Sequence, residues 1–153
     1  MDNSLEISLN QKILTLTLNR PDRLNGFTET MSKSLLDQII KASNDDTIRV
    51  IVLTGAGTIF SSGMDLDGLL ADGFDAVDIY KILENLYNPL IRAMTACPKP
   101  IICGLNGIAA GGAASLVLAC DIIVARRSAR LVSAFSRIGL VPDCGGSWFY
   151  PHA

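Results

Sequence analysis

The stretch IICGLNGIAAGGAASLVLACDIIVARR, Ile101–Arg127, decides the fold. It begins with a short apolar run typical of a buried strand, and Asn106-Gly107 is a turn dipeptide. Gly111-Gly112 then opens an apolar helix of small residues that ends near Cys120, and a second strand follows. The first N–H groups of such a helix can hold an oxyanion, but small residues there are equally typical of close packing between a helix and a strand.

The composition fits one buried domain, which we assign to residues 1–153. The chain has 153 residues, 49% of them hydrophobic, and a mean hydropathy of +0.36. A membrane span fits the length of the central apolar run, but Asn106, Asp121 and the two glycines inside it disfavour that interpretation. A net charge of −2, with no basic cluster longer than Arg126-Arg127, argues against nucleic acid as a partner.

Cysteine and histidine usage gives no sign of a metal site. The four cysteines lie in apolar or small-residue settings without a C-x-x-C spacing, and His152 is the only histidine. Buried free thiols suit a reducing compartment. The N-terminal residues do not have the pattern of a secretory signal, so we expect a cytoplasmic protein.

The chain before the central stretch is predicted to form two strands, a helix and a third strand. Leu5–Leu9 and Ile13–Leu18 alternate apolar and polar residues, which predicts a hairpin with one buried side. Thr28 is the expected N-cap of a helix whose buried face carries Met31, Leu35, Ile39 and Ala42. Val50–Thr54 is a continuous apolar run, which we interpret as a strand covered on both faces.

The loop Phe60–Leu66 follows this strand and contains a glycine. Loops at the carboxyl ends of strands are where α/β proteins bind ligands, although a plain tight turn is the simpler interpretation. Asp67–Asp78 is expected to be a mobile acidic surface segment leading into a helix over Ala76–Ala96. Ala129–Val132 is predicted as a last strand, and Ile138–Ser147 as a loop that turns into another helix.

Four motifs in order make the chain similar to the crotonase (enoyl-CoA hydratase/isomerase) superfamily. They are LTLNRPDRLN, VLTGAGTIFSSGMDL, NGIAAGGAASLVLACD and IGLVPDCGGSW. The resemblance implies an α/β fold of the crotonase type, a spiral of β-β-α units with helices outside. The family's helical C-terminal portion has no counterpart in this sequence, so a C-terminally truncated version of the fold is expected.

The resemblance also implies a ligand and a site. Family members bind acyl-CoA thioesters, form trimers or hexamers in their full-length form, and need no cofactor because coenzyme A is part of the substrate. The thioester oxygen is held by two backbone N–H groups, which fall here on Met64 and Gly112. The neighbouring positions implied to bind substrate are Arg23, Asn25, Ser62, Gly63, Asp65, Leu66 and Gly111.

The departures from the family pattern bear on the reaction. Hydratases of the family use two glutamates, and the matching positions here hold Ser115 and Phe135, neither of which can act as a carboxylate base. Asp143 is the remaining carboxylate in a matching motif, and its alternative interpretation is a cap for the helix that starts near Gly145-Gly146. AFSRIGLVPDCGGSW most resembles the branch of ring-1,2-epoxyphenylacetyl-CoA isomerases in phenylacetate degradation, where this aspartate is the acid/base.

The resulting expectation is an acyl-CoA isomerase that stabilises a thioester enolate and uses Asp143 to move a proton. One carboxylate suffices for such a reaction, because it removes a proton at one carbon and returns it at another. A Δ3-Δ2-enoyl-CoA isomerase and an enoyl-CoA hydratase are the alternatives within the family. A non-catalytic acyl-CoA-binding or assembly fragment is the alternative of another class.

Overall fold

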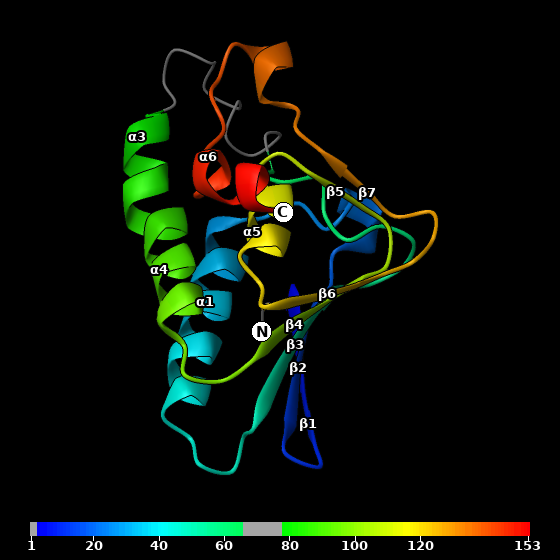
Figure 1. Cartoon of the computed structure of the whole chain (residues 1–153), viewed down its shortest axis with the longest axis vertical. Coiled ribbons are helices and arrows are strands. Elements are labelled where there is room, and N and C mark those ends of the chain that lie inside the picture. The colour runs from blue at the N-terminus through cyan, green and yellow to red at the C-terminus, as the bar shows by residue number, and fades with distance from the viewer. Residues whose placement is uncertain (1–2, 66–77) are drawn as a thin grey trace.

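The computed structural model describes residues 3–65 and 78–153. Its centre is a five-stranded sheet in the order β1-β2-β3-β4-β6. The hairpin of β1 (Leu5–Asn10) and β2 (Ile13–Leu18) is antiparallel, as predicted. The strands β3 (Val50–Gly55), β4 (Ile101–Leu105) and β6 (Ile122–Ala125) then follow in parallel. Helices and sheets together give the α/β arrangement that the sequence predicts (Figure 1).

A second, smaller sheet carries the loops that concern function. It pairs β5 (Ile108–Ala110) with β7 (Arg130–Val132) in parallel. An isolated bridge between Ser61 and Ala109 ties the loop after β3 to the same sheet. The prediction of a strand near Ala129–Val132 is therefore confirmed, whereas β5 was read only as part of a glycine-rich turn.

Helices pack beside the five-stranded sheet, where α1 (Glu29–Ser43) and α4 (Asn88–Ala96) lie next to each other (Figure 1). Thr28 caps α1 as predicted, because its Oγ1 accepts from the Met31 amide at 3.2 Å. The helix expected over Ala76–Ala96 starts within the described residues as α3 (Ile79–Ile82), and runs through a π-helical turn, η3 (Leu83–Tyr87), into α4. The part of that prediction before residue 78 lies outside the described residues, as does most of the expected acidic segment.

Short helices complete the chain. The small-residue helix α5 spans Gly112–Leu118 and α6 spans Gly146–Phe149, so both predicted helix starts are confirmed. The 3-10 turns are η1 (Pro21–Arg23), η4 (Phe135–Ile138) and η5 (Tyr150–His152). Both glycine-rich motifs therefore end at a helix.

The core lies between the helices and one face of the sheet. Leu14, Leu16 and Leu18 alternate toward it, as the hairpin pattern predicts. In β3 only Ile51, Leu53 and Gly55 are buried, and the residues between them are half-buried. The expectation that β3 is covered on both faces is therefore wrong, because a continuous apolar run does not tell how many faces the helices cover.

Two polar residues of the central stretch, Asn106 and Asp121, are hydrogen-bonded to backbone groups. Asn106 Nδ2 donates to the carbonyls of Gly57 at 3.1 Å and Ile59 at 3.0 Å, which holds the loop after β3. Asp121 Oδ2 accepts from the Ile101 amide at 2.8 Å. These residues fasten loops to strands. Within residues 3–65 and 78–153, no helix is both long and apolar enough to cross a membrane.

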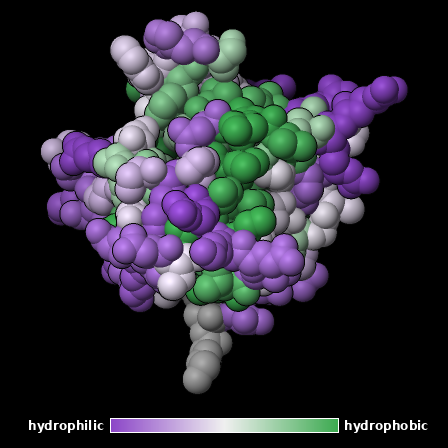
Figure 2. All heavy atoms as spheres, turned by 60° about the horizontal axis from the view of Figure 1, so that its bottom comes forward, coloured by the Kyte–Doolittle hydropathy of each residue, from purple (hydrophilic) through white to green (hydrophobic). Residues whose placement is uncertain are grey.

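Apolar side chains are also exposed on the sheet. They include Ile7, Leu9 and Ile13 in the hairpin and Ile122, Ile123 and Val124 in β6. Figure 2 shows a broad hydrophobic area on one face of the molecule, bordered by hydrophilic side chains. Exposed apolar areas of this kind are typical of surfaces that another segment or subunit covers. The expected homo-oligomer stays a prediction.

Candidate active site

The amide of Met64 is oriented by a short bridge to Phe27. Phe27 donates its N–H to the Gly63 carbonyl at 2.8 Å and accepts from the Asp65 amide at 3.0 Å. Successive backbone N–H groups of an extended segment point to opposite sides, so the Met64 N–H points away from Phe27. The other side of this segment faces the start of α5.

Gly63 brings the loop against α5. A Cβ on Gly63 would lie 2.8 Å from the Ala110 carbonyl oxygen and 3.8 Å from the Gly112 nitrogen, and its φ of +92° also favours glycine. The buried Ser61 hydroxyl accepts from the Gly63 amide at 3.1 Å and donates to the Asn25 carbonyl at 2.8 Å. The turn at Gly63 is therefore held by close packing against the start of α5 on one side and by the hydrogen bonds of Ser61 on the other.

The amides of Met64 and Gly112 are two neighbouring hydrogen-bond donors. Neither of them donates to another residue in the described part of the chain. Unpaired backbone donors held by packed loops are the components of an oxyanion site. The structure thus brings together the two residues from which the resemblance implies that the thioester oxygen is held.

Asp143 lies at the same place. A Cβ on Gly112 would be 3.4 Å from Asp143 Oδ1 and 3.1 Å from Cys144 Sγ, so the carboxyl group packs directly against the helix start. Asp143 Oδ1 is buried and has no hydrogen-bond partner among the described residues. Burial raises the pKa of Asp143 above its usual value.

The capping interpretation of Asp143 does not hold. No side chain caps α6, whose N-cap residue is Gly145. Asp143 contributes only its backbone carbonyl, which accepts from the Gly146 amide at 2.7 Å. Its carboxylate is therefore not occupied by the helix start that follows it.

The two positions of the family's glutamates are both buried. Ser115 is 0% and Phe135 is 4% exposed. Ser115 Oγ has no partner among the described residues and packs against Gly146, where an added Cβ would lie 2.7 Å from it. Neither residue brings a carboxylate to the site, so Asp143 is the carboxylate that these elements place beside Gly112.

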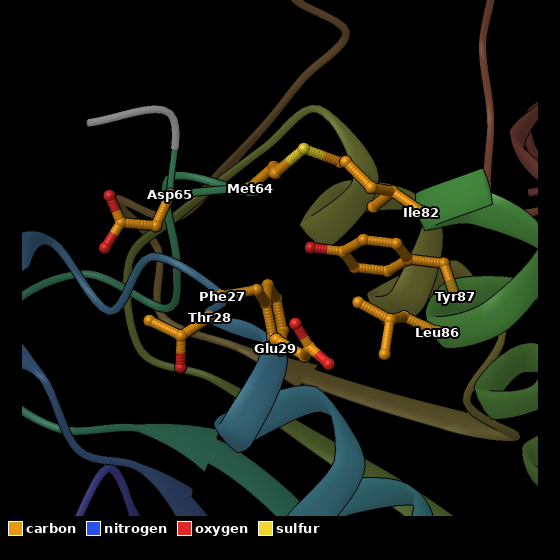
Figure 3. Close-up of a pocket in the computed structure, with 8 residues that line it drawn as sticks. All are labelled: Phe27, Thr28, Glu29, Met64, Asp65, Ile82, Leu86 and Tyr87. Carbon is orange, nitrogen blue, oxygen red and sulfur yellow. The ribbon is translucent and has the colours of Figure 1, made fainter. Parts of the chain in front are cut away.

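A pocket of about 240 Å³ opens beside Met64. Figure 3 shows the Tyr87 ring extending from the helix wall, with its hydroxyl pointing into the pocket. Phe27 and Tyr87 meet edge to face, with ring centroids 6.2 Å apart. The residues that line the pocket are Phe27, Thr28, Glu29, Met64, Asp65, Ile82, Leu86 and Tyr87.

Tyr87 is a site residue that the sequence interpretation missed. It lies in a predicted helix without a motif of its own, and helical periodicity alone gives no reason to place it in a pocket. The π-helical turn directs Tyr87 toward the pocket, and helical periodicity in the sequence does not predict such a turn.

Asn25, expected to bind substrate, has a side chain that is not available to a ligand. It is 0% exposed. Its Nδ2 donates to the carbonyls of Ala56 at 2.9 Å and Ile59 at 3.1 Å, and its Oδ1 accepts from the Arg20 amide at 2.9 Å. Asn25 therefore joins the loops after β2 and β3.

Asp65 is likewise engaged, because its Oδ2 pairs with Arg20 Nη1 at 2.6 Å. Arg20 Nη1 also donates to the Gly26 carbonyl at 2.6 Å. The pair fastens the residue after Met64 to the end of β2. Asp65 reaches the pocket wall at the same time, so its position is compatible with both support and substrate contact.

The remaining expected residues lie around these loops. Arg23 and Ser62 are exposed. Gly111 has a φ of +55° and donates its amide to the Val132 carbonyl at 2.9 Å, which sets the direction of Gly112. Leu66 lies outside the described residues. In the described ranges, no group of three or more His, Cys, Asp or Glu side chains is arranged to hold a metal ion.

A mixed five-stranded sheet, a second small sheet and, in the described part of the chain, two unpaired amides and a buried carboxylate at the loops define the crotonase-type class. Residues 8–153 match the family model "Enoyl-CoA hydratase/isomerase". The chain belongs to this family.

Individual relatives agree with that assignment. The 1,2-epoxyphenylacetyl-CoA isomerase of Escherichia coli (strain K12) is 49% identical over 140 residues, which are 91% of this chain and 53% of that protein. The probable enoyl-CoA hydratase of Rhodobacter capsulatus is 37% identical over 148 residues, 97% of this chain and 56% of that protein. The crystal structure of an enoyl-CoA hydratase from Polaromonas sp. JS666 superposes with a TM-score of 0.87 at 34% identity, covering 97% of this chain and 58% of that one. The chain therefore spans about half the length of the curated relatives it matches.

Proposed function

We propose that the chain carries the catalytic site of an acyl-CoA isomerase that works through a thioester enolate. The amides of Met64 and Gly112 bind the thioester oxygen, and Asp143 moves the proton. The observation that carries this proposal is the position of the Asp143 carboxyl group, packed against Gly112 without a hydrogen-bond partner for Oδ1 in the described part of the chain.

The chemistry needs one base and one oxyanion site. Asp143 takes a proton from a carbon made acidic by the thioester, and the electron pair moves onto the thioester oxygen. Asp143 then returns the proton to a different carbon, which moves the double bond and regenerates the carboxylate. Removing one oxyanion donor typically costs about 3–4 kcal/mol of transition-state stabilisation, so the two amides account for a large part of the rate.

The raised pKa of Asp143 suits this role. A carboxyl group with its ordinary pKa is a weak base at neutral pH, and burial makes the carboxylate more basic. Ser115 and Phe135 leave hydration without the second carboxylate that would activate water. The isomerase name of the 49% identical relative supports the same choice over a hydratase.

The test compares Asp143→Asn with the unchanged chain. Isomerisation of a 3-enoyl-CoA is followed by the appearance of the conjugated 2-enoyl thioester, and acyl-CoA binding by calorimetry. We expect a loss of turnover of about 10²–10⁴-fold, with affinity kept within about tenfold. Asp46→Asn, at an exposed position, is the matched control and should change neither quantity.

Two results would overturn the proposal. An Asp143→Asn variant that isomerises at the original rate would mean that another group is the base. Binding of acyl-CoA without turnover in the unchanged chain would favour a non-catalytic acyl-CoA-binding protein.

A further inference from the structure

Cys144 is a buried residue next to the proposed acid/base that the proposed function does not use. It precedes α6, which packs against α5 (Figure 1). Cys144 is only 4% exposed, so its thiol is enclosed at this contact. Its φ of +51° lies in the left-handed region, which is unfavourable for a residue with a Cβ. The loop therefore holds a cysteine in a conformation that suits glycine, directly after Asp143.

The thiol of Cys144 and the carboxyl group of Asp143 meet at the start of α5. A Cβ on Gly112 would lie 3.1 Å from Cys144 Sγ and 3.4 Å from Asp143 Oδ1. The thiol donates a hydrogen bond to the Asp143 carboxyl group. Asp143 Oδ1 has no hydrogen-bond partner in the described part of the chain, so one carboxylate oxygen stays free to accept a proton from a substrate.

The two groups influence each other's protonation. Burial raises the pKa of Asp143, and the hydrogen bond from Cys144 acts in the opposite direction. Burial and the charge of Asp143 raise the pKa of the Cys144 thiol, so the thiol keeps its proton at neutral pH. A protonated thiol is a hydrogen-bond donor, and a donor beside a carboxylate favours its charged form.

Two further titratable groups in the described part of the chain interact with the charge of Asp143. They are Tyr87 from η3 and Tyr150 from η5, and burial raises the pKa of both phenols, which are therefore uncharged at neutral pH. The residues of α5 and α6 that face this contact are glycines and a serine, which do not titrate. Among the described side chains, the Cys144 thiol is the one that lowers the pKa of Asp143.

We propose that Cys144 is a positioning residue for the proton transfer, whose thiol holds the Asp143 carboxylate by a hydrogen bond and keeps it oriented beside Gly112. The thiol keeps its own proton throughout, so no bond to sulfur forms or breaks. The inference rests on the proposed function, because it takes Asp143 as the base. It adds a residue that acts through Asp143 without touching the substrate.

Infrared spectroscopy of the S–H stretch tests the hydrogen bond itself, without any substrate. Subtracting the spectrum of Cys144→Ala from that of the unchanged chain isolates the band of this thiol. A hydrogen bond to a carboxylate is stronger than one to a carboxylic acid, so the band should move to lower frequency as rising pH ionises Asp143. In an Asp143→Asn background the band should not move with pH. A band that does not respond to pH in the unchanged chain would overturn the inference.

The pH profile of kcat tests the consequence for the base. Cys144→Ala removes the donor, so the acid limb of the profile, where Asp143 takes up a proton, should move to higher pH. The carboxylate is then also free to turn, so kcat on the plateau should fall about three- to tenfold, the effect of one lost hydrogen bond, with KM unchanged. Cys144→Ser keeps a donor at this position and should restore both the plateau and the acid limb.

Two further variants serve as controls. Cys103→Ala removes another buried thiol, in β4, and should leave the pH profile in place. Cys144→Gly also lacks the thiol and suits the positive φ, so it takes the place of Cys144→Ala if alanine prevents folding.

The kinetic results can also decide against the inference. If the thiol-free variant keeps the acid limb and kcat of the unchanged chain, the thiol does not position Asp143. If Cys144→Ser behaves like Cys144→Ala, the packing of the sulfur atom matters and the hydrogen bond does not. Failure of the proposed function looks different, because turnover is then absent or insensitive to Asp143→Asn, while the S–H band of Cys144 still responds to pH.

Discussion

Gly112→Ala tests the close approach between α5 and the Asp143 loop. Gly112 is the first residue of α5 and does not have a positive φ, so alanine suits its backbone. The difficulty for an alanine side chain is steric crowding. The added Cβ would lie 3.1 Å from Cys144 Sγ, which is too close, and 3.4 Å from Asp143 Oδ1. Cys144 Sγ must therefore give way by a few tenths of an ångström, and we expect the adjoining Asp143, which is itself at ordinary contact distance, to shift with it.

The expected effect is larger on activity than on stability. Overpacking of a buried site typically costs about 1–3 kcal/mol, partly offset by the better helix propensity of alanine, about 1 kcal/mol. We expect a net loss of about 0–2 kcal/mol, or a few degrees in Tm. Misplacement of a catalytic group by about 1 Å can cost about 100-fold, so a smaller shift of Asp143 predicts a loss of about 10- to 100-fold in turnover.

The assay combines urea denaturation with isomerase kinetics, and Cys144→Ala supplies the control. Removing Sγ frees the space that the new methyl group needs, so the double variant should be more stable than the sum of the single effects predicts, by about 1 kcal/mol. Gly112→Val, with a larger and branched side chain, should reduce binding and turnover further. A Gly112→Ala variant with unchanged turnover and stability would refute the proximity of Gly112 and Asp143.

Three further predictions concern the supports of the site. Asn25→Ala should destabilise the chain by about 3 kcal/mol in denaturant, because it removes three part-buried hydrogen bonds of a buried side chain, and a loss below about 1 kcal/mol would contradict the structural role. Asp143→Asn should raise Tm at pH 7, because the raised pKa of the folded state makes the unchanged protein lose stability as the pH rises above the ordinary carboxyl pKa. The difference in Tm between the two proteins should therefore shrink toward acid pH, and a difference that is the same at every pH would exclude the Asp143 charge as its cause. Arg20→Gln removes the ion pair with Asp65 and should lower stability by about 1–2 kcal/mol and turnover more than affinity; unchanged kinetics would show that the pair does not position Met64.

Most of the secondary structure was predictable from short sequence patterns, because each pattern depends only on residues that are close together in the chain. Alternation in Ile13–Leu18 gave the buried side of β2, and Thr28 gave the start of α1. The glycines at residues 111 and 112 gave the start of α5. These signals depend on local backbone chemistry, which the sequence states directly.

Features set by tertiary contact were not predictable in the same way. β5 has three residues and exists through its partner β7 and the bridge to Ser61. The half-buried outer face of β3 depends on where the helices pack. Asn25 was expected at the substrate, and only its partners at Ala56 and Ile59, more than 30 positions away, show that it joins loops.

The residues of the candidate site were predictable where a motif contained them. Met64, Gly112 and Asp143 come from three separate motifs, and the structure brings them together. Tyr87 has no such motif, and its position depends on a π-helical turn that interrupts the helical period. The pocket beside Met64 therefore had to be found in three dimensions.

The most direct test of whether Asp143 makes the chain an isomerase is to identify by NMR the products that it forms from two substrates in D₂O. From a 3-enoyl-CoA we predict the 2-enoyl isomer, with deuterium at the newly protonated carbon to the extent that the proton on Asp143 exchanges with solvent before it is returned. From crotonyl-CoA we predict no 3-hydroxybutyryl-CoA. Hydration of crotonyl-CoA at rates of about 1–10³ s⁻¹, typical of good enzymes, would contradict this prediction, because neither Ser115 nor Phe135 can activate the water.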